Sequence, residues 1–128
     1  MKPESSAFLA KARAFRDRAP TLLAAGFTDE AGRAAYFAGF HAAQAFIFEK
    51  IGRSPKTHSG VQTEFARWAK RETAIDGELR AFLGRPFNLK SISGYATGSD
   101  STVTLAQAEA AITTARRFVQ AVEQLIHA

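Results

Sequence analysis

The chain has 128 residues, the size of a single domain, and carries a formal net charge of +5 from 17 Lys and Arg against 12 Asp and Glu. It has no cysteine, which excludes disulfides and thiolate metal sites, and its three histidines lie too far apart in sequence to form a ligand pair, so we expect no metal and no cofactor. The N-terminal residues lack the apolar segment of a signal peptide, and the longest apolar stretch, residues 36–48, is interrupted by polar residues, so we expect a soluble cytoplasmic protein.

The first predicted helix runs from about Glu4 to about Ala19 and carries a polar face of lysine and arginine. Pro20 follows it, and because proline lacks the amide hydrogen and clashes with the preceding turn, we expect it to break or kink the chain. A short helical piece over Thr21–Ala25 then ends at Gly26. This region is therefore predicted as one long helix followed by one short helix.

The second predicted helix starts after Thr28, a good N-cap residue, and ends near Ile51, directly before Gly52. Apolar side chains lie on nearly all of its faces: Tyr36, Phe40, Ala43 and Ile47 share one side, and Phe37, Ala45 and Phe48 fall on others. A helix with this pattern is buried on more than one side. In so short a chain, it is either the central helix of the bundle or part of a subunit interface.

A turn at residues 52–57 precedes a third predicted helix, which begins near Thr57 or His58. The side chains of this helix that we expect to point inward are Val61, Phe65 and Trp68. A fourth helical region, about Asp76–Ser93, is interrupted by a glycine and a proline, and a loop rich in glycine and serine follows over Gly94–Thr102. These segments predict short helices joined by turns.

The last predicted helix is the most regular element of the chain. Thr104 and Gln107 have the spacing of a capping box at its start. Apolar residues then repeat at intervals of three and four: Leu105, Ala108, Ile112, Ala115, Val119, Val122 and Ile126. Such a stripe faces a helical partner, and no strand pattern of comparable quality exists in the sequence. The predicted fold is therefore all-α, a single domain over residues 1–128 folded as an antiparallel bundle of four to five helices.

Three segments carry a family resemblance. The sequence RAAYFAGFHAA at residues 33–43 resembles the R-x-x-Y-Y-A-x-F-H-A-A signature of one branch of small prokaryotic HEPN-domain proteins. The sequence KTHSGV at residues 56–61 is similar to the motif that follows it in that branch, and residues 104–119 resemble its closing helix. The order and spacing of the three segments together make the resemblance specific.

The resemblance implies a HEPN-like bundle that forms a homodimer across helix faces, in a cytoplasmic prokaryotic setting. Many HEPN proteins are metal-independent endoribonucleases, and many are toxins paired with a nucleotidyltransferase-type antitoxin. Others are non-catalytic modules that bind a nucleotide or a partner protein. The resemblance therefore leaves two functions open: a ribonuclease acting on RNA, and a binding module.

The HEPN ribonucleases use an arginine and a histidine separated by four to six residues. Histidine can remove the proton from the RNA 2′-OH, and arginine can stabilise the charge that gathers on the phosphate. Arg53 and His58 have this spacing and are the candidate catalytic pair. Arg/His pairs at this spacing also arise by chance, and we favour somewhat a structural role in which His58 caps or packs the start of the third helix.

A second place to look for the motif is the segment from Lys90 to Tyr95. The branch has arginine where this chain has Lys90, and the toxins have histidine where it has Tyr95. Lysine lacks the bidentate fork of arginine, and tyrosine is a poor base at neutral pH. A binding role or a degenerate site fits Lys90 and Tyr95 better than catalysis.

Three further residues are candidate binding residues. Arg33 and Tyr36 lie one helical turn apart, where they either line a polar pocket or reach toward solvent from the helix edge. His41 lies on the helix that is apolar nearly all round, where a core or interface histidine is the commoner outcome.

The candidate functions differ in what they require of the structure. A ribonuclease requires Arg53 and His58 to converge near a dimer groove. A binding module requires an open groove with basic walls and no converged pair, and a purely structural bundle requires no concave polar pocket. The positive net charge favours polyanions, but ordinary charged helix surfaces explain it equally well.

Overall fold

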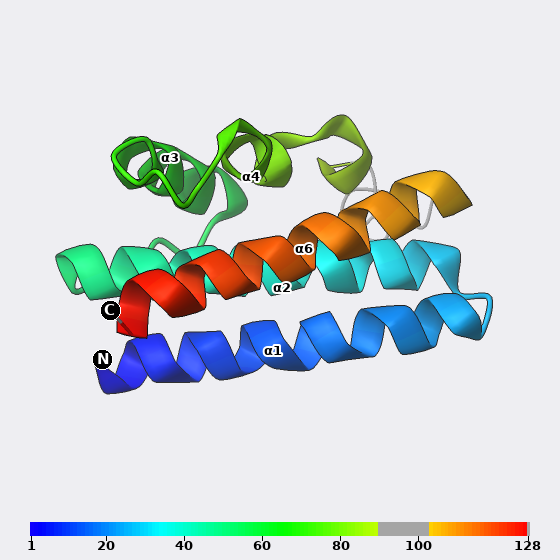
Figure 1. Ribbon diagram of the computed structural model, residues 1–128, viewed down its shortest axis with the longest axis horizontal. Coiled ribbons are helices and arrows are strands. Elements are labelled where there is room, and N and C mark those ends of the chain that lie inside the picture. The colour runs from blue at the N-terminus through cyan, green and yellow to red at the C-terminus, as the bar shows by residue number, and fades with distance from the viewer. Residues whose placement is uncertain (90–102, 128) are drawn as a thin grey trace.

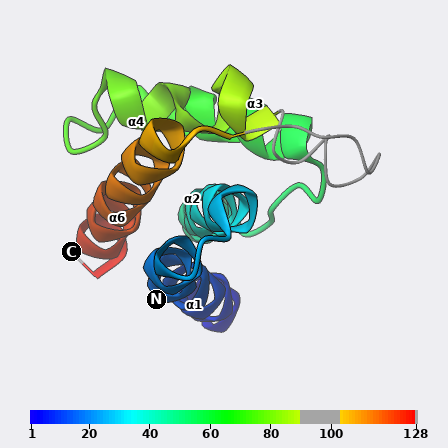
Figure 2. The same ribbon diagram turned by 90° about the vertical axis from the view of Figure 1, so that its right-hand side faces the viewer.

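The computed structural model describes residues 1–89 and 103–127, and in these ranges it consists of helices and turns without strands (Figure 1). The elements are α1 (Pro3–Ala24), α2 (Thr28–Ile51), α3 (His58–Ala69), α4 (Gly77–Ala81), the 3-10 turn η1 (Phe82–Gly84) and α6 (Leu105–His127). Figure 2 shows α1 and α2 as an antiparallel pair, α6 alongside them, and α3 and α4 as a layer across the top. The predicted all-α antiparallel bundle is confirmed.

Helix α1 is longer than predicted. It continues through Pro20 to Ala24, so the expectation that Pro20 breaks or kinks the chain into two helices is wrong. The proline removes one backbone hydrogen bond, but the last turn is held by tertiary packing, because Leu22 and Leu23 pack against the hydrophobic core. Packing thus outweighs the local preference of proline.

The turn between α1 and α2 is a Schellman motif. The amide of Phe27 donates to the carbonyl of Leu22 at 2.9 Å, and the amide of Gly26 donates to the carbonyl of Leu23 at 3.0 Å. Gly26 has a φ of +88°, which glycine adopts without steric cost. The N-cap of α2 is Phe27 without a side-chain cap, so Thr28 is the first helical residue and not the predicted cap.

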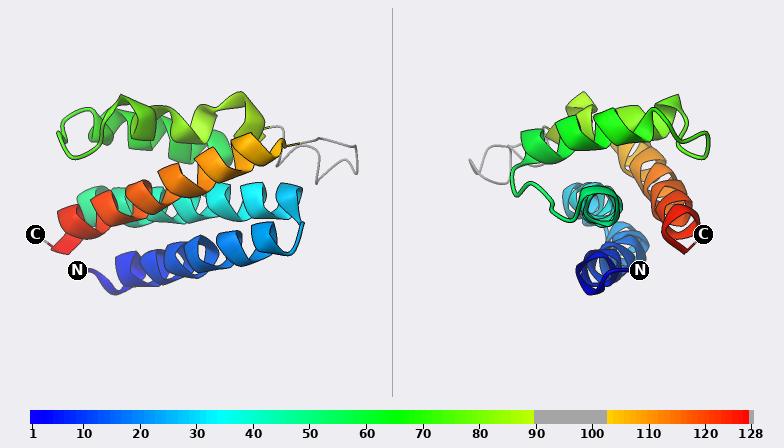
Figure 3. Two further views of the ribbon diagram at one scale, coloured as in Figure 1. Left: turned by 45° about the vertical axis from the view of Figure 1, so that its right-hand side comes forward. Right: turned by 90° about the vertical axis from the view of Figure 1, so that its left-hand side faces the viewer.

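Helix α2 is the central helix of the chain. It packs against α1, α3 and α6, and Tyr36 and Phe40 are only 1% and 9% exposed within one chain (Figure 3). Of the two alternatives left open by its sequence, the structure has the central helix. A second subunit is therefore not needed to cover Tyr36 and Phe40. The neighbouring ring of Phe37 is only half-buried. The homodimer stays a prediction that rests on the family resemblance.

A cluster of phenylalanines joins the layers. The ring of Phe65 on α3 lies 5.8 Å from that of Phe46 on α2 and 4.9 Å from that of Phe118 on α6, centroid to centroid. Phe82 of η1 lies 6.0 Å from Phe118 and sits directly on Gly39 of α2, where an added Cβ would come within 2.7 Å of its ring. Gly39 thus allows the close approach of η1 to α2.

Side chains cap the helices of the second half, and the predicted capping box at the start of α6 is confirmed. Thr57 accepts a hydrogen bond from the amide of Gly60 at 3.0 Å. Thr104 and Gln107 form the capping box, with both side chain to backbone distances at 3.1 Å. The fourth helical region is interrupted near Gly84 as predicted: α4 gives way to η1 after Ala81, and the chain is helical again over residues 86–89. The predicted loop over Gly94–Thr102 lies outside the described residues.

The inward positions of α3 and α6 also agree with their sequence patterns. Val61 and Phe65 are buried, and Trp68 is half-buried. Most of the α6 stripe is buried, whereas Leu105 at its first turn is 57% exposed. Among the helices formed by residues 1–89 and 103–127, none combines the length and apolar character needed to cross a bilayer.

Candidate functional site

One side of α2 is only half covered within the chain. Half-buried residues lie there at helical spacing and meet a matching row on α1. We call this surface the α1–α2 face, defined by Phe15, Arg18, Arg33, Phe37 and His41. The rings along it are in contact: Phe15 lies 5.5 Å from Phe37 and 5.6 Å from His41, centroid to centroid. The α1–α2 face therefore offers aromatic surface to solvent beside two arginines.

A pocket of about 350 Å³ opens on the α1–α2 face. Its lining residues are Phe15, Arg18, Leu22, Glu30, Arg33, Ala34 and Phe37. The guanidinium carbon of Arg18 lies 4.9 Å from the centre of the Phe15 ring, a cation–π arrangement that fixes its place at the pocket wall. The pocket thus combines two aromatic rings with two guanidinium groups.

Tyr36, which is buried, and His58, which is half-buried, form a hydrogen-bonded pair next to the α1–α2 face. The Tyr36 hydroxyl and Nδ1 of His58 share a short hydrogen bond that joins α2 to the first residue of α3, and the two rings lie 5.5 Å apart. Burial raises the pKa of Tyr36, so its phenol keeps its proton at neutral pH. When this phenol donates to Nδ1, the remaining imidazole proton sits on Nε2.

Nε2 of His58 is itself inaccessible. This atom is buried and has no hydrogen-bond partner among the described residues. A ring that carries its proton on Nε2 and accepts at Nδ1 has no lone pair left to take a proton from a substrate. The predicted structural role of His58, packing at the start of the third helix, agrees with this arrangement.

Arg53 lies in a different environment from His58. Its side chain is exposed and lines a pocket of about 220 Å³ together with Ile51, Ser54, Pro55 and Glu64. His58 is not among the lining residues of this pocket. Arg53 therefore borders a surface pocket, whereas His58 is hydrogen-bonded to Tyr36.

His41 is tied into a hydrogen-bonded chain between α2 and the turn before α3. Its Nδ1–H donates to Oε1 of Gln44 at 2.8 Å, and Nε2 of Gln44 donates to the carbonyl of Pro55 at 3.4 Å. Burial lowers the pKa of His41, the hydrogen bond to Gln44 opposes this shift, and the positive charge of Lys11 adds to it. His41 is therefore a neutral, positioned ring at physiological pH.

A family model of the HEPN domain matches residues 5–125, nearly the whole chain. The chain belongs to the HEPN family. A comparison with curated protein sequences finds no match. Family membership accounts for the helical bundle. It also supports a general HEPN-family role, which in this family is often related to RNA or nucleotides.

The sequence-predicted residues of this HEPN protein fall into three groups. Arg33, Tyr36 and His41 lie along α2, and the structure brings Tyr36 together with His58. Arg53 stands apart from them in its own pocket. Lys90 and Tyr95 lie outside the described residues.

The residues that sequence reasoning missed are on α1. The sequence gives the first helix a polar face of lysine and arginine but assigns no functional role to Phe15 or Arg18. Their spacing of three residues puts them on neighbouring positions of one helix edge. Only the packing of α1 on α2 shows that this edge meets Arg33 and Phe37.

Proposed function

We propose that this HEPN protein binds a nucleotide unit, free or within single-stranded RNA, and does not cleave it. The observation that carries the proposal is the hydrogen bond between Tyr36 and His58. It occupies the histidine of the candidate catalytic pair, whereas the nearby α1–α2 face stays accessible and offers polar and aromatic side chains.

The pocket on the α1–α2 face suits the two parts of a nucleotide. Bases stack on aromatic rings without regard to sequence, and Phe15 and Phe37 present half-buried rings for this purpose. Arginine forks bind phosphate oxygens in pairs, and Arg18 and Arg33 line the same pocket. Glu30 at the wall repels excess negative charge, which favours a single phosphate over a cluster of them.

Cleavage would require a base and an arginine at one phosphate. Nε2 of His58 is buried, and with Tyr36 as donor it carries the ring proton. Arg53, the proposed partner in the pair, lines a pocket to which His58 does not contribute. These features support binding over metal-independent ribonuclease activity. A second copy of the chain and a nucleotidyltransferase, the partners implied by the resemblance, stay predictions.

The test is a binding measurement by fluorescence anisotropy with a labelled single-stranded RNA of roughly ten nucleotides, a length that covers one site. Adenosine monophosphate is added as a competitor to distinguish a free nucleotide from a strand. Arg18→Gln and Phe15→Ala should each weaken binding by about tenfold, because each removes a charged or stacking contact. The matched control is Arg67→Gln, which removes the same charge from an exposed site on α3.

The salt dependence sharpens the test. Each phosphate contact on a single strand adds about −0.7 to the slope of log affinity against log salt, so Arg18→Gln should make the slope shallower by about that amount and Arg67→Gln should not. The same RNA is incubated with excess protein in EDTA and should stay intact. RNA cleavage that is lost in His58→Ala would overturn the proposal in favour of a ribonuclease. Equal RNA affinities of Arg18→Gln and Arg67→Gln would show that the α1–α2 face is not the binding site.

A further inference from the structure

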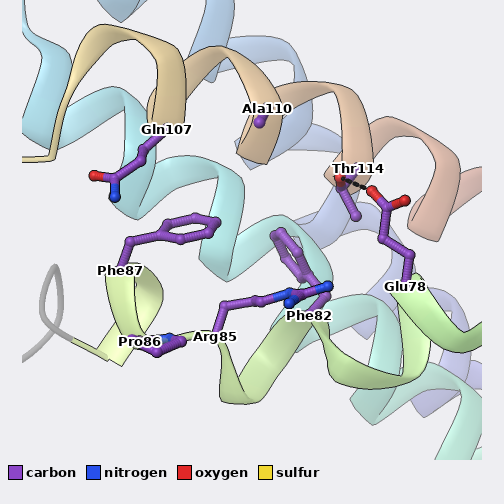
Figure 4. A pocket seen from close by; sticks show the side chains of 8 residues that line it. All are labelled: Glu78, Phe82, Arg85, Pro86, Phe87, Gln107, Ala110 and Thr114. Atoms are coloured by element: carbon purple, nitrogen blue, oxygen red, sulfur yellow. Dashed lines mark hydrogen bonds between the residues drawn. The ribbon is translucent and has the colours of Figure 1, made fainter.

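A second pocket lies on another part of the molecule, between α6 and the segment that runs from α4 through η1 to Phe87 (Figure 4). Its volume of about 420 Å³ is in the range of pockets that hold small organic ligands. It shares no lining residue with the pocket on the α1–α2 face. A ligand in this pocket would therefore contact none of the residues that line the proposed nucleotide site.

Two phenylalanines form the apolar wall of this α4–α6 pocket. Phe82 is 2% exposed and is locked in place by Phe118 and Gly39 behind it. Phe87 is half-buried, and Figure 4 shows its ring pointing into the pocket from the other side. Two rings that border one space, with the small side chain of Ala110 across from them, suit a flat ring.

The acidic group in the α4–α6 pocket is already engaged. Oε1 of Glu78 accepts a hydrogen bond from the Thr114 hydroxyl at 2.9 Å, and its Oε2 lies 3.5 Å from a guanidinium nitrogen of Arg117. Its charge is thereby partly offset by Arg117. Glu78 defines one end of the pocket without dominating its charge.

The polar groups that remain available are donors. Gln107 also lines the pocket; its Oε1 accepts the amide of Thr104 at 3.1 Å, and its NH₂ group makes no hydrogen bond with a residue that the structure describes. Arg85 is exposed, and its guanidinium makes no hydrogen bond or ion pair with any residue that the structure describes. A ligand that satisfies Arg85 and Gln107 must bring hydrogen-bond acceptors and a negative charge.

We propose that the α4–α6 pocket binds a small planar aromatic anion: a flat ring held between Phe82 and Phe87, with its carboxylate or phosphate on Arg85. An aryl carboxylate and a nucleoside monophosphate share this chemistry. The two ligand classes differ in the size of the group that joins the ring to the anion. Their affinities for the pocket, measured side by side, therefore show which class it prefers.

The experiment is a titration of the ¹⁵N-labelled protein followed by NMR, with 4-hydroxybenzoate in one arm and adenosine monophosphate in the other. Saturable shifts of the backbone amides of Phe87, Gln107 and Thr114 are expected in at least one arm, with a dissociation constant below about 1 mM. Cyclohexanecarboxylate lacks the aromatic ring and should bind about twofold to tenfold more weakly than the aryl carboxylate. Benzamide lacks the charge and should bind more weakly still.

Two variants test the residues. Arg85→Gln removes an exposed charge and should weaken binding by at least about tenfold, whereas Arg116→Gln on α6, outside this pocket, should leave it unchanged. Ala110→Phe fills the pocket from an exposed position of α6 and should abolish the shifts without disturbing the rest of the spectrum. No saturable shifts in either arm, equal affinities of Arg85→Gln and Arg116→Gln, or equal binding of the aromatic and cyclohexane acids would each overturn the proposal.

Discussion

Both sides of α2 carry phenylalanine, but the two sides differ in how far the rest of the chain covers them. On one side, Phe46 and Gly39 are covered by Phe65 and Phe82, so that these contacts are aromatic and buried. On the other side, Phe37 stands half-buried beside α1, next to arginines and a pocket. The difference teaches that an aromatic residue on this helix stabilises the fold or serves binding according to which element packs over it.

The largest expected effect comes from truncating the covered side. Phe46→Ala should lower the free energy of unfolding by about 3–5 kcal/mol, because it leaves a cavity in the core. Phe37→Ala on the other side should lower it by about 1 kcal/mol, since only part of this ring is buried. Urea denaturation of the two variants checks the comparison, and equal losses would show that the half-open side is part of the core.

The next effect concerns the contact between Gly39 and Phe82. Gly39→Ala places a Cβ 2.7 Å from the Phe82 ring, and we expect a loss of about 1–3 kcal/mol from overpacking, measured as a shift in the denaturation midpoint. Gly77→Ala is the control, because its Cβ would meet only the end of the flexible Arg80 side chain at 3.6 Å. A stabilised Gly39→Ala variant would mean that η1 moves away from α2 freely.

The boundary between the two sides is tested at Tyr36. Tyr36→Phe removes the donor to His58 Nδ1 and should lower the free energy of unfolding by about 1–2 kcal/mol, because a buried acceptor loses its partner. The ¹⁵N shifts of the His58 ring should change at the same time. In a double-mutant cycle with His58→Ala, the two losses should be less than additive, and strict additivity would count against the hydrogen bond.

The smallest effect is a pH dependence at His41. Its pKa is lowered in the folded state, so the unfolded chain binds more protons below the ordinary histidine pKa, and stability falls as the pH drops from about 7 to about 5. His41→Gln should flatten this part of the stability curve relative to the wild-type protein. Chemical denaturation at a series of pH values measures both, and an unchanged curve for His41→Gln would argue against a buried neutral ring.

Much of the fold could be predicted because its signals are local. The capping box of Thr104 and Gln107, the N-cap at Thr57 and the glycine after α2 each act over three or four residues, within the reach of one helical turn. The buried stripe of α6 follows from helical spacing in the same way. For the site, the sequence identified Tyr36, His41 and His58 as residues of interest but not the contacts among them.

The sequence by itself thus determined that the chain is helical, where most helices end and which family it belongs to. The tertiary structure decided that α1 runs through Pro20, that Tyr36 is hydrogen-bonded to His58, and that Arg18 of α1 and Arg33 of α2 line one pocket. These outcomes depend on packing between segments far apart in the chain. Local propensities of a few tenths to a few kcal/mol per residue can be overridden by such packing, and they carry no information on which distant side chain will be the neighbour.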